Sequence, residues 1–330
     1  MPGAPRPRRI RCGAVEPESV AFARKSPEGA SQLGDGADGL SENALSDPVI
    51  LGHGRTHTLN PMSVATIHRW RGRSFDPVDE CNVGEVVLHA ADSWRVEDGL
   101  MLAHDLHRAR FTQAVLQAAI TPPLPPEELD AFWDAAMTMI ARAGAGFPRV
   151  ELRSVRGAPE LRLLLREAPP RQRSIRLATH LERDPRTQPT VKGPDLDSMM
   201  RLRGVAGNRG VDELVIVSPN GYVVEGTSSA LCWWVGDLLA FPAADLPRVD
   251  SVTARAVRAL ATATAVEIID EHRTPAELDG YEIWAVNALH GIRVVTEWAD
   301  GPHPAELPGR AQSWRDRLAR LRGPLPGGQS

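Results

Sequence analysis

Two apolar runs on either side of a four-residue turn are the clearest structural signal in the sequence. The first run is Leu-Val-Ile-Val at residues 214–217, the turn is Ser-Pro-Asn-Gly at 218–221, and the second run is Tyr-Val-Val at 222–224. Asn-Gly readily adopts the positive φ angles of tight hairpin turns, and β-branched residues favour strands. The sequence therefore predicts a β-hairpin over residues 213–225.

Strands and helices alternate along most of the chain. Short apolar or alternating segments predict strands at residues 85–89, 93–96, 150–155, 161–165, 231–235, 238–241, 266–269, 282–286 and 292–296. Apolar residues at helical spacing predict helices at residues 105–120, from 126 onward, at 197–205, from 251 onward and at 311–321. This mixture predicts an α/β (α+β) fold.

Changes in composition divide the sequence into four parts. Residues 1–62 are rich in Pro, Gly, Ser, Arg and Asp and have no sustained apolar period, so they predict a disordered leader. A Pro- and Arg-rich stretch at residues 169–188 predicts a connection between domains near residue 180. We expect a small α/β domain over residues 65–180, a larger β-rich domain over 186–300, and a C-terminal tail with a short helix over 301–330.

Composition also excludes several classes of protein. The chain has 330 residues, 42% hydrophobic and 24% charged, as in an ordinary soluble enzyme. No apolar run approaches the roughly 18 residues of a membrane helix, and no apolar segment of a secretory signal follows the Arg-rich start. A net charge of −4 argues against a general nucleic-acid-binding surface. We expect a cytoplasmic protein that binds neither membrane nor nucleic acid.

Several familiar sites are missing from the sequence. The three cysteines, Cys12, Cys81 and Cys232, are too widely spaced for a paired zinc motif and too few for a disulfide framework. His53 and His57 lie four residues apart, but in the expected leader and without further ligands. There is no phosphate-binding loop of the Gly-x-x-x-x-Gly-Lys type. We predict no metal site.

Lysine is almost absent. Of 38 basic residues only Lys25 and Lys192 are lysine, and the other 36 (38 − 2) are arginine. A G+C-rich coding sequence favours Arg codons and explains the general bias. It does not explain why Lys192 remains.

Six short motifs occur in a fixed order between residues 67 and 298. They are His107-Arg-Ala-Arg110-Phe111, Val191-Lys192-Gly-Pro-Asp195, Gly210-Val-Asp-Glu213, Val224-Glu225-Gly-Thr-Ser-Ser-Ala230, Ser251-Val-Thr253 and Asn287-Ala-Leu-His-Gly-Ile292. Together they resemble the fold-type IV pyridoxal-phosphate enzymes, the class IV aminotransferase group that includes branched-chain and D-amino-acid aminotransferases and aminodeoxychorismate lyase. The resemblance implies a small N-terminal α/β domain, a larger β-rich pseudo-barrel domain, and the cofactor pyridoxal 5′-phosphate between them.

The resemblance also implies roles for individual residues. Lys192 would form a Schiff base with the cofactor and, as a free amine, move a proton between the substrate Cα and C4′. Glu225 would keep the pyridine nitrogen protonated. Arg110 would bind the phosphate, together with Val252 and Thr253 at a helix N-terminus. The remaining residues expected to approach the cofactor are Ser228, Ser229, Ala288 and Leu289.

The substrate side departs from the family pattern. Alanines at residues 90–91 replace a bulky pocket wall, and the Arg-x-His associated with D-amino-acid carboxylates is missing after Arg156-Gly157. The residues expected to contact substrate are Asp92, His89, Trp94 and His290. For each of them, an ordinary core or surface position is the alternative.

The implied function is that of an aminotransferase, which moves an amino group between an amino acid or amine and a keto acid. Family members are homodimers, so a homodimer is expected. Asn287-Ala-Leu resembles the corresponding loop of the lyases, which leaves an aminodeoxychorismate lyase activity, releasing pyruvate and an aminobenzoate, as the alternative. A non-catalytic relative is the third hypothesis, and the presence of both Lys192 and Glu225 argues against it.

Overall fold

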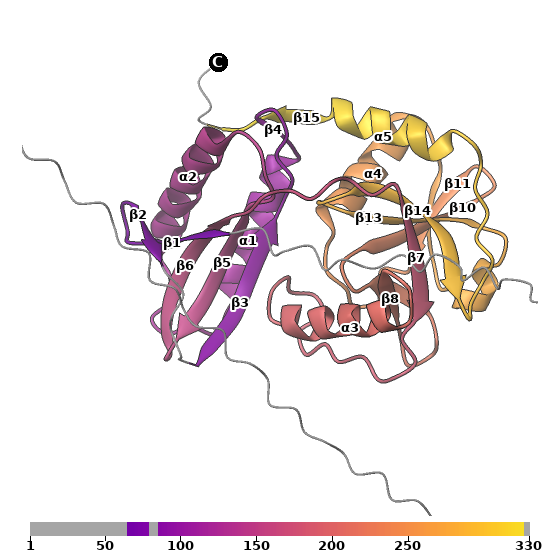
Figure 1. Cartoon of the computed structure of the whole chain (residues 1–330), viewed down its shortest axis with the longest axis horizontal. Coiled ribbons are helices and arrows are strands. Elements are labelled where there is room, and N and C mark those ends of the chain that lie inside the picture. The colour runs from indigo at the N-terminus through magenta and orange to yellow at the C-terminus, as the bar shows by residue number, and fades with distance from the viewer. Residues whose placement is uncertain (1–64, 79–84, 327–330) are drawn as a thin grey trace, which may run out of the picture. The chain divides into compact units, whose positions relative to one another are not determined.

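The computed structural model describes residues 65–78 and 85–326 (Figure 1). The expected leader at residues 1–62 lies outside the described residues, as do Cys12, Cys81 and the two histidines of the leader. Among the residues that are described, no helix is both long and apolar enough to cross a membrane. Cys232 is a free thiol in the interior.

The first sheet has five antiparallel strands in the order β2-β1-β6-β5-β3. These strands are β1 (Thr66–Trp70), β2 (Phe75–Val78), β3 (Val86–Ser93), β5 (Arg149–Val155) and β6 (Ala158–Leu165). Helices α1 (His104–Gln117) and α2 (Pro126–Ala143), both of which the sequence predicted, pack against this sheet. The two strands expected at residues 85–89 and 93–96 are replaced by the single strand β3.

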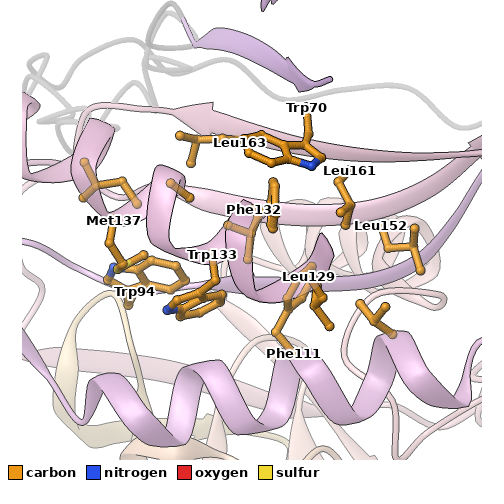
Figure 2. Close-up of a cluster of buried hydrophobic side chains, with 14 of the residues drawn as sticks. Trp70, Trp94, Phe111, Leu129, Phe132, Trp133, Met137, Leu152, Leu161 and Leu163 are labelled. Atoms are coloured by element: carbon orange, nitrogen blue, oxygen red, sulfur yellow. The ribbon is translucent and has the colours of Figure 1, made fainter. Parts of the chain in front are cut away.

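An aromatic cluster fills the space between these helices and the sheet (Figure 2). The Phe132 ring is fully buried, and its centroid lies 6.0 Å from that of Trp70 and 6.1 Å from that of Phe111. Trp133 packs 5.3 Å from Trp94. Helix α2 begins at Pro126, whose fixed φ suits the first helical turn, and its apolar face supplies both Phe132 and Trp133. This cluster holds β3 and α1 in place.

The second sheet has eight strands in the order β12-β11-β10-β13-β14-β7-β8-β9. They are β7 (Ser174–Thr179), β8 (Glu213–Val217), β9 (Val223–Gly226), β10 (Ala230–Val235), β11 (Leu238–Pro242), β12 (Ile268–Glu271), β13 (Glu282–Asn287) and β14 (Gly291–Ala299). The sheet is mixed, because β7 runs parallel to both β8 and β14, and β11 runs parallel to β12. The mixture of elements confirms the α/β (α+β) class.

Three helices and a 3-10 turn accompany the second sheet. Helix α3 (Leu196–Asn208) contacts β8, while α4 (Val252–Ala263) and α5 (Arg310–Arg320) share a core with Trp234 and Trp284. The 3-10 turn η1 covers Pro275–Leu278. The predicted hairpin is confirmed: β8 pairs with β9, and the Gly221 amide donates to the Ser218 carbonyl at 2.8 Å.

Besides β1 and β2, which the sequence did not predict, two further features were not anticipated from the sequence. Strand β7 lies inside the stretch expected to connect the domains, and its pairing with β8 and β14 makes it part of the second sheet. Its six residues were not predicted as a strand because Pro and Arg residues flank them on both sides. The chain therefore leaves the first sheet after Leu165 and enters the second at Ser174, while the domain boundaries themselves stay a prediction.

The second feature is a short ladder formed by the C-terminal tail. After the predicted helix α5, strand β15 (Arg322–Pro324) pairs antiparallel with β4 (Leu100–Leu102). The tail thus returns to the segment between β3 and α1.

Replacing Phe132 tests the aromatic core. We expect Phe132→Ala to lower the free energy of unfolding by about 3–5 kcal/mol, because it removes a fully buried ring and leaves a cavity. Urea denaturation followed by circular dichroism measures this loss. The control is Leu116→Ala on α1, where the side chain is 58% exposed and the loss should stay below about 1 kcal/mol. Equal losses in the two variants would contradict the assignment of this core.

Candidate active site

A cavity of about 470 Å³ opens beside the β3 edge of the first sheet and the β9, β10 and β13 strands of the second. All nine residues that the sequence associated with the cofactor line it: Arg110, Lys192, Glu225, Ser228, Ser229, Val252, Thr253, Ala288 and Leu289. They come from α1, the segment before α3, strand β9, the β9–β10 turn, the start of α4 and the β13–β14 turn. The fold therefore brings together residues that are up to 179 positions apart (289 − 110).

The backbone of Lys192 is held by strand β3. Its carbonyl accepts a hydrogen bond from the Ala91 amide at 2.8 Å. The next residue, Gly193, has φ +143°, and a Cβ there would lie 2.8 Å from the Cα of Ala90, so only glycine fits this close approach. Burial and the positive charge of Arg110 both lower the pKa of the Lys192 amine. The uncharged amine is therefore more populated near neutral pH than it is for a solvent-exposed lysine.

Asp195 closes the loop that carries Lys192. One of its carboxylate oxygens accepts from both the amide and the hydroxyl of Thr187 at 2.8 Å, and the other accepts from the Gln188 amide at 2.8 Å. These bonds tie residues 187–188 to the residue before helix α3. Lys192 lies within the closed loop, and its position is fixed from both sides.

Glu225 lies at the end of β9, buried and facing the cavity. Its carboxylate pairs with Arg186, whose guanidinium also donates to Asp184 at 2.7 Å. Burial raises the pKa of Glu225 to about 7, while the charges of Arg186 and Lys192 act in the opposite direction. Arg186 is therefore the group that favours an ionised Glu225 in this dry position.

Arg110 is oriented by Asp92. Its Nε and Nη2 donate to the two oxygens of Asp92 at 2.8 and 2.7 Å, and its Nη1 donates to the Asp250 carbonyl at 2.8 Å. Burial opposes ionisation of Asp92, but the charges of Arg110 and of His107, 2.8 Å away, outweigh it and lower the pKa. Asp92 is completely buried behind Arg110. It positions this arginine and does not reach the cavity expected to hold substrate.

The N-terminus of α4 lies beside Arg110 in the cavity wall. Ser251 caps the helix, accepting from the Ala254 amide at 3.2 Å, and Val252 and Thr253 form the first turn. The first amides of a helix lack partners within the helix and carry partial positive charge. Together with Arg110 they form a site suited to a phosphate group.

The β9–β10 turn is fixed by a buried ion pair. Glu213 accepts hydrogen bonds from the hydroxyls of Ser228 and Ser229 at 2.7 and 2.9 Å, and it pairs with Arg293 at 2.6 Å. A Cβ on Gly226 would lie 2.7 Å from the Glu213 carboxylate. Both serine hydroxyls thus donate to Glu213. Ser228 and Ser229 line the cavity as part of the turn that this carboxylate fixes.

The other three residues expected to contact substrate lie elsewhere. His89 Nε2 lies 2.9 Å from the Ser154 hydroxyl and does not line the cavity. Trp94 is in the aromatic core. His290 accepts from the Gln172 amide at 3.2 Å, and burial lowers its pKa to about 4. Trp94 and His290 line a smaller, neighbouring cavity.

Four arginines that the sequence did not single out do line the main cavity: Arg149, Arg166, Arg186 and Arg203. Among 36 arginines, none of them stood out by type or motif. The one signal in the sequence was their position, because Arg149 directly precedes one predicted strand and Arg166 directly follows the next. Over residues 65–78 and 85–326, no group of three or more His, Cys, Asp or Glu side chains is arranged to hold a metal ion.

Comparison with known proteins decides the family. The sequence pattern of the class IV amino-transferases matches residues 89–298, which include every residue of the cavity named above. The chain belongs to the class IV aminotransferase family. A search of curated proteins finds no match for it.

Three solved structures place this class IV family member among fold-type IV enzymes. A fold IV-transaminase from Curtobacterium pusillum shares 20% identity and a TM-score of 0.62, covering 78% of this chain and 97% of that one. A branched-chain amino acid aminotransferase from T.th., in complex with N-(5′-phosphopyridoxyl)-L-glutamate, shares 18% identity and a TM-score of 0.64, covering 79% of this chain and 94% of that one. A protein from Legionella pneumophila assigned as a 4-amino-4-deoxychorismate lyase shares 15% identity and a TM-score of 0.59, covering 72% of this chain and 90% of that one. The predicted fold is confirmed.

Gly193 offers a test of the contact between Lys192 and β3. We expect Gly193→Ala to lower the free energy of unfolding by about 1–3 kcal/mol, because the new methyl group collides with the Ala90 backbone at a positive φ. Thermal unfolding measures the change. Gly204→Ala in α3 is the matched control: nothing lies within 4 Å of its Cβ, so the helix should gain up to about 1 kcal/mol. A neutral Gly193→Ala would refute the close approach.

Proposed function

We propose that this class IV family member is a pyridoxal 5′-phosphate-dependent aminotransferase, which moves an amino group between an amino acid or amine and a keto acid. The observation that carries the proposal is the placing of Lys192 and Glu225 on one cavity, near enough that each charge affects the pKa of the other. A lysine amine is the group that binds the aldehyde of this cofactor, and a buried carboxylate is one of the groups that can pair with its ring nitrogen.

The residues present fit the cofactor. Arg110 and the first turn of α4 suit its phosphate, the amine of Lys192 suits its aldehyde, and Glu225 suits its ring nitrogen. The cavity volume of about 470 Å³ is typical of small-molecule sites. The phosphopyridoxyl compound bound to the T.th. aminotransferase supports the same choice. When bound, the cofactor accepts the electron pair left on the substrate Cα as its proton departs.

Lys192 moves that proton in our proposal. Its Nζ would take the proton from the substrate Cα and return it at C4′ of the cofactor. Taking up the proton requires an uncharged amine. Burial and Arg110 favour the uncharged form. The closed loop at Asp195 and the hydrogen bond from Ala91 restrict the backbone, so that the flexible part of Lys192 is its side chain.

Glu225 holds a proton at the ring nitrogen in this scheme, and only its ionised form can accept that N–H. Arg186 opposes the effect of burial and sustains the ionised form. We also propose a cytoplasmic location and a homodimer, the latter supported by the resemblance of the motifs.

A lyase is the second candidate, and the β13–β14 turn supports it. Asn287 accepts from the His290 amide at 2.8 Å and donates to the Ser229 hydroxyl at 3.3 Å, which fixes the Asn-Ala-Leu segment that resembles the lyases. The Legionella pneumophila protein supports this candidate as well. In a lyase, the same loss of the Cα proton leads to the release of pyruvate in place of storage of the amino group.

Absorption spectroscopy tests the proposal. We expect purified protein with pyridoxal 5′-phosphate to show the visible band of the lysine-bound cofactor, and Lys192→Ala to lack it. For an aminotransferase, one amino donor should abolish the band and a keto acid should restore it. A band that no donor discharges, with pyruvate released from aminodeoxychorismate, would favour the lyase. No band in the wild type would refute the cofactor assignment.

The pH dependence of cofactor affinity tests Arg186. Cofactor affinity should fall as the pH decreases through about 7, because Glu225 then becomes protonated in the free enzyme. Arg186→Gln removes the charge that lowers this pKa, so the fall should occur at higher pH. Fluorescence titration at a series of pH values measures both midpoints. Arg201→Gln is the control, since Arg201 is exposed on α3 and donates to the neighbouring Ser198 hydroxyl. Identical midpoints for Arg186→Gln and wild type would contradict this role.

A further inference from the structure

We propose that Arg149 and Arg166 form a carboxylate-binding subsite for the amino donor, so that the substrate is an amino acid and not a simple amine. The inference rests on the proposed function and deepens it. Both arginines line the cavity that contains Lys192.

The two arginines are held side by side by the first sheet. Arg149 is the first residue of β5 and lies opposite Leu164 of β6, while Arg166 directly follows β6. The Phe147 amide donates to the Arg166 carbonyl at 2.8 Å and continues the pairing beyond the strands. The position of each guanidinium is therefore set by regular strand pairing and not by a mobile loop.

The guanidinium of Arg166 is anchored by neutral groups. Its Nε donates to the Phe147 carbonyl at 3.0 Å, its Nη2 donates to the Ser93 hydroxyl at 3.2 Å, and its central carbon lies 4.8 Å from the centre of the Phe147 ring. These contacts orient the cation without neutralising it. Burial, and then the charge of Arg149, lower the pKa of Arg166 to about 10, which still leaves it protonated at neutral pH.

Within the part of the chain that the structure describes, Arg149 and Arg166 have a single carboxylate, that of Glu151, close to them. Arg149 pairs with the buried Glu151, but its Nε is buried and finds no hydrogen-bond partner among the described residues. Two adjacent guanidinium groups thus have one carboxylate between them. An anion that enters the cavity would relieve their repulsion, and the guanidinium groups that line the cavity offer it charge-assisted N–H donors.

The other buried cations of the cavity are already committed. Arg110 is paired with Asp92, and Arg186 is paired with Asp184 and Glu225. The phosphate site at α4 is built separately from Arg149 and Arg166, which belong to the first sheet. The excess positive charge at these two residues therefore suits the substrate, and the planar fork of an arginine matches a carboxylate.

Binding of an unreactive acid tests the subsite apart from catalysis. The probe is 4-methylpentanoate, which carries a carboxylate and no amino group, and the comparison is the neutral 4-methylpentanamide. Calorimetry on the cofactor-loaded enzyme should give tighter binding of the acid than of the amide. Arg166→Gln and Arg149→Gln should each weaken acid binding about tenfold, as expected for loss of a charge-assisted hydrogen bond, and leave amide binding unchanged.

Two further variants complete the experiment. Arg142→Gln removes an exposed arginine at the end of α2 and should bind the acid as wild type does. Arg166→Lys retains the charge without the fork, so it should lose less affinity than Arg166→Gln and should keep the fold if Arg166→Gln does not. Among substrates, kcat/KM for amino acids should fall in Arg166→Gln, while that for the corresponding amines should not.

The outcomes separate the two proposals. If the visible cofactor band is present and all variants bind the acid as wild type does, the subsite is wrong and the aminotransferase proposal stands. Equal binding of acid and amide by wild type would also overturn the subsite. If the band is absent even with added pyridoxal 5′-phosphate, but the acid binds the protein without cofactor and Arg166→Gln weakens that binding, the subsite stands and the proposed function fails.

Discussion

The hydrogen bond from the Ala91 amide to the Lys192 carbonyl is the contact on which the site depends. It joins the edge strand of the first sheet to the segment that precedes α3, which packs on the second. Gly193 allows the two backbones to approach to this distance. A lysine side chain is long and flexible, so its usefulness depends on a backbone that does not move. Strand β3 supplies that restraint, and the aromatic core behind β3 supplies its rigidity.

Around this contact, buried charges are arranged in separate pairs, each with a different task. Asp92 orients Arg110, Arg186 supports Glu225, and Glu213 with Arg293 fixes the β9–β10 turn. Buried ion pairs contribute little net stability, because desolvation offsets their attraction. Their value here lies in geometry, since each fixes the direction of a group that faces the cavity. Charges that the protein leaves without full partners, at Arg149 and Arg166, then define where an anion is favoured.

The residues that the sequence assigned to the cofactor gather on one cavity, whereas those assigned to the substrate do not, for a physical reason. Residues such as Lys192 and Glu225 occur in short motifs whose order along the chain carries information. His89, Trp94 and His290 were chosen because they are unusual residue types in that part of the chain, but their burial depends on contacts with distant elements. Trp94, for example, is enclosed by α2, which follows it by more than thirty residues. No sequence signal distinguished Arg149 and Arg166 from the many other arginines, because only strand pairing brings these two together.

The ladder between β4 and β15 has a consequence for how the chain folds. It pairs residues 100–102 with residues 322–324, which lie far apart in the sequence. On a ribosome, residues 100–102 must wait until residues 322–324 emerge before this partner exists. Closing so long a loop carries an entropic penalty that only neighbouring structure can offset. Helix α5, packed against Trp234 and Trp284, brings the last strand to its place. This part of the fold is thus completed only after residues 322–324 have been synthesised.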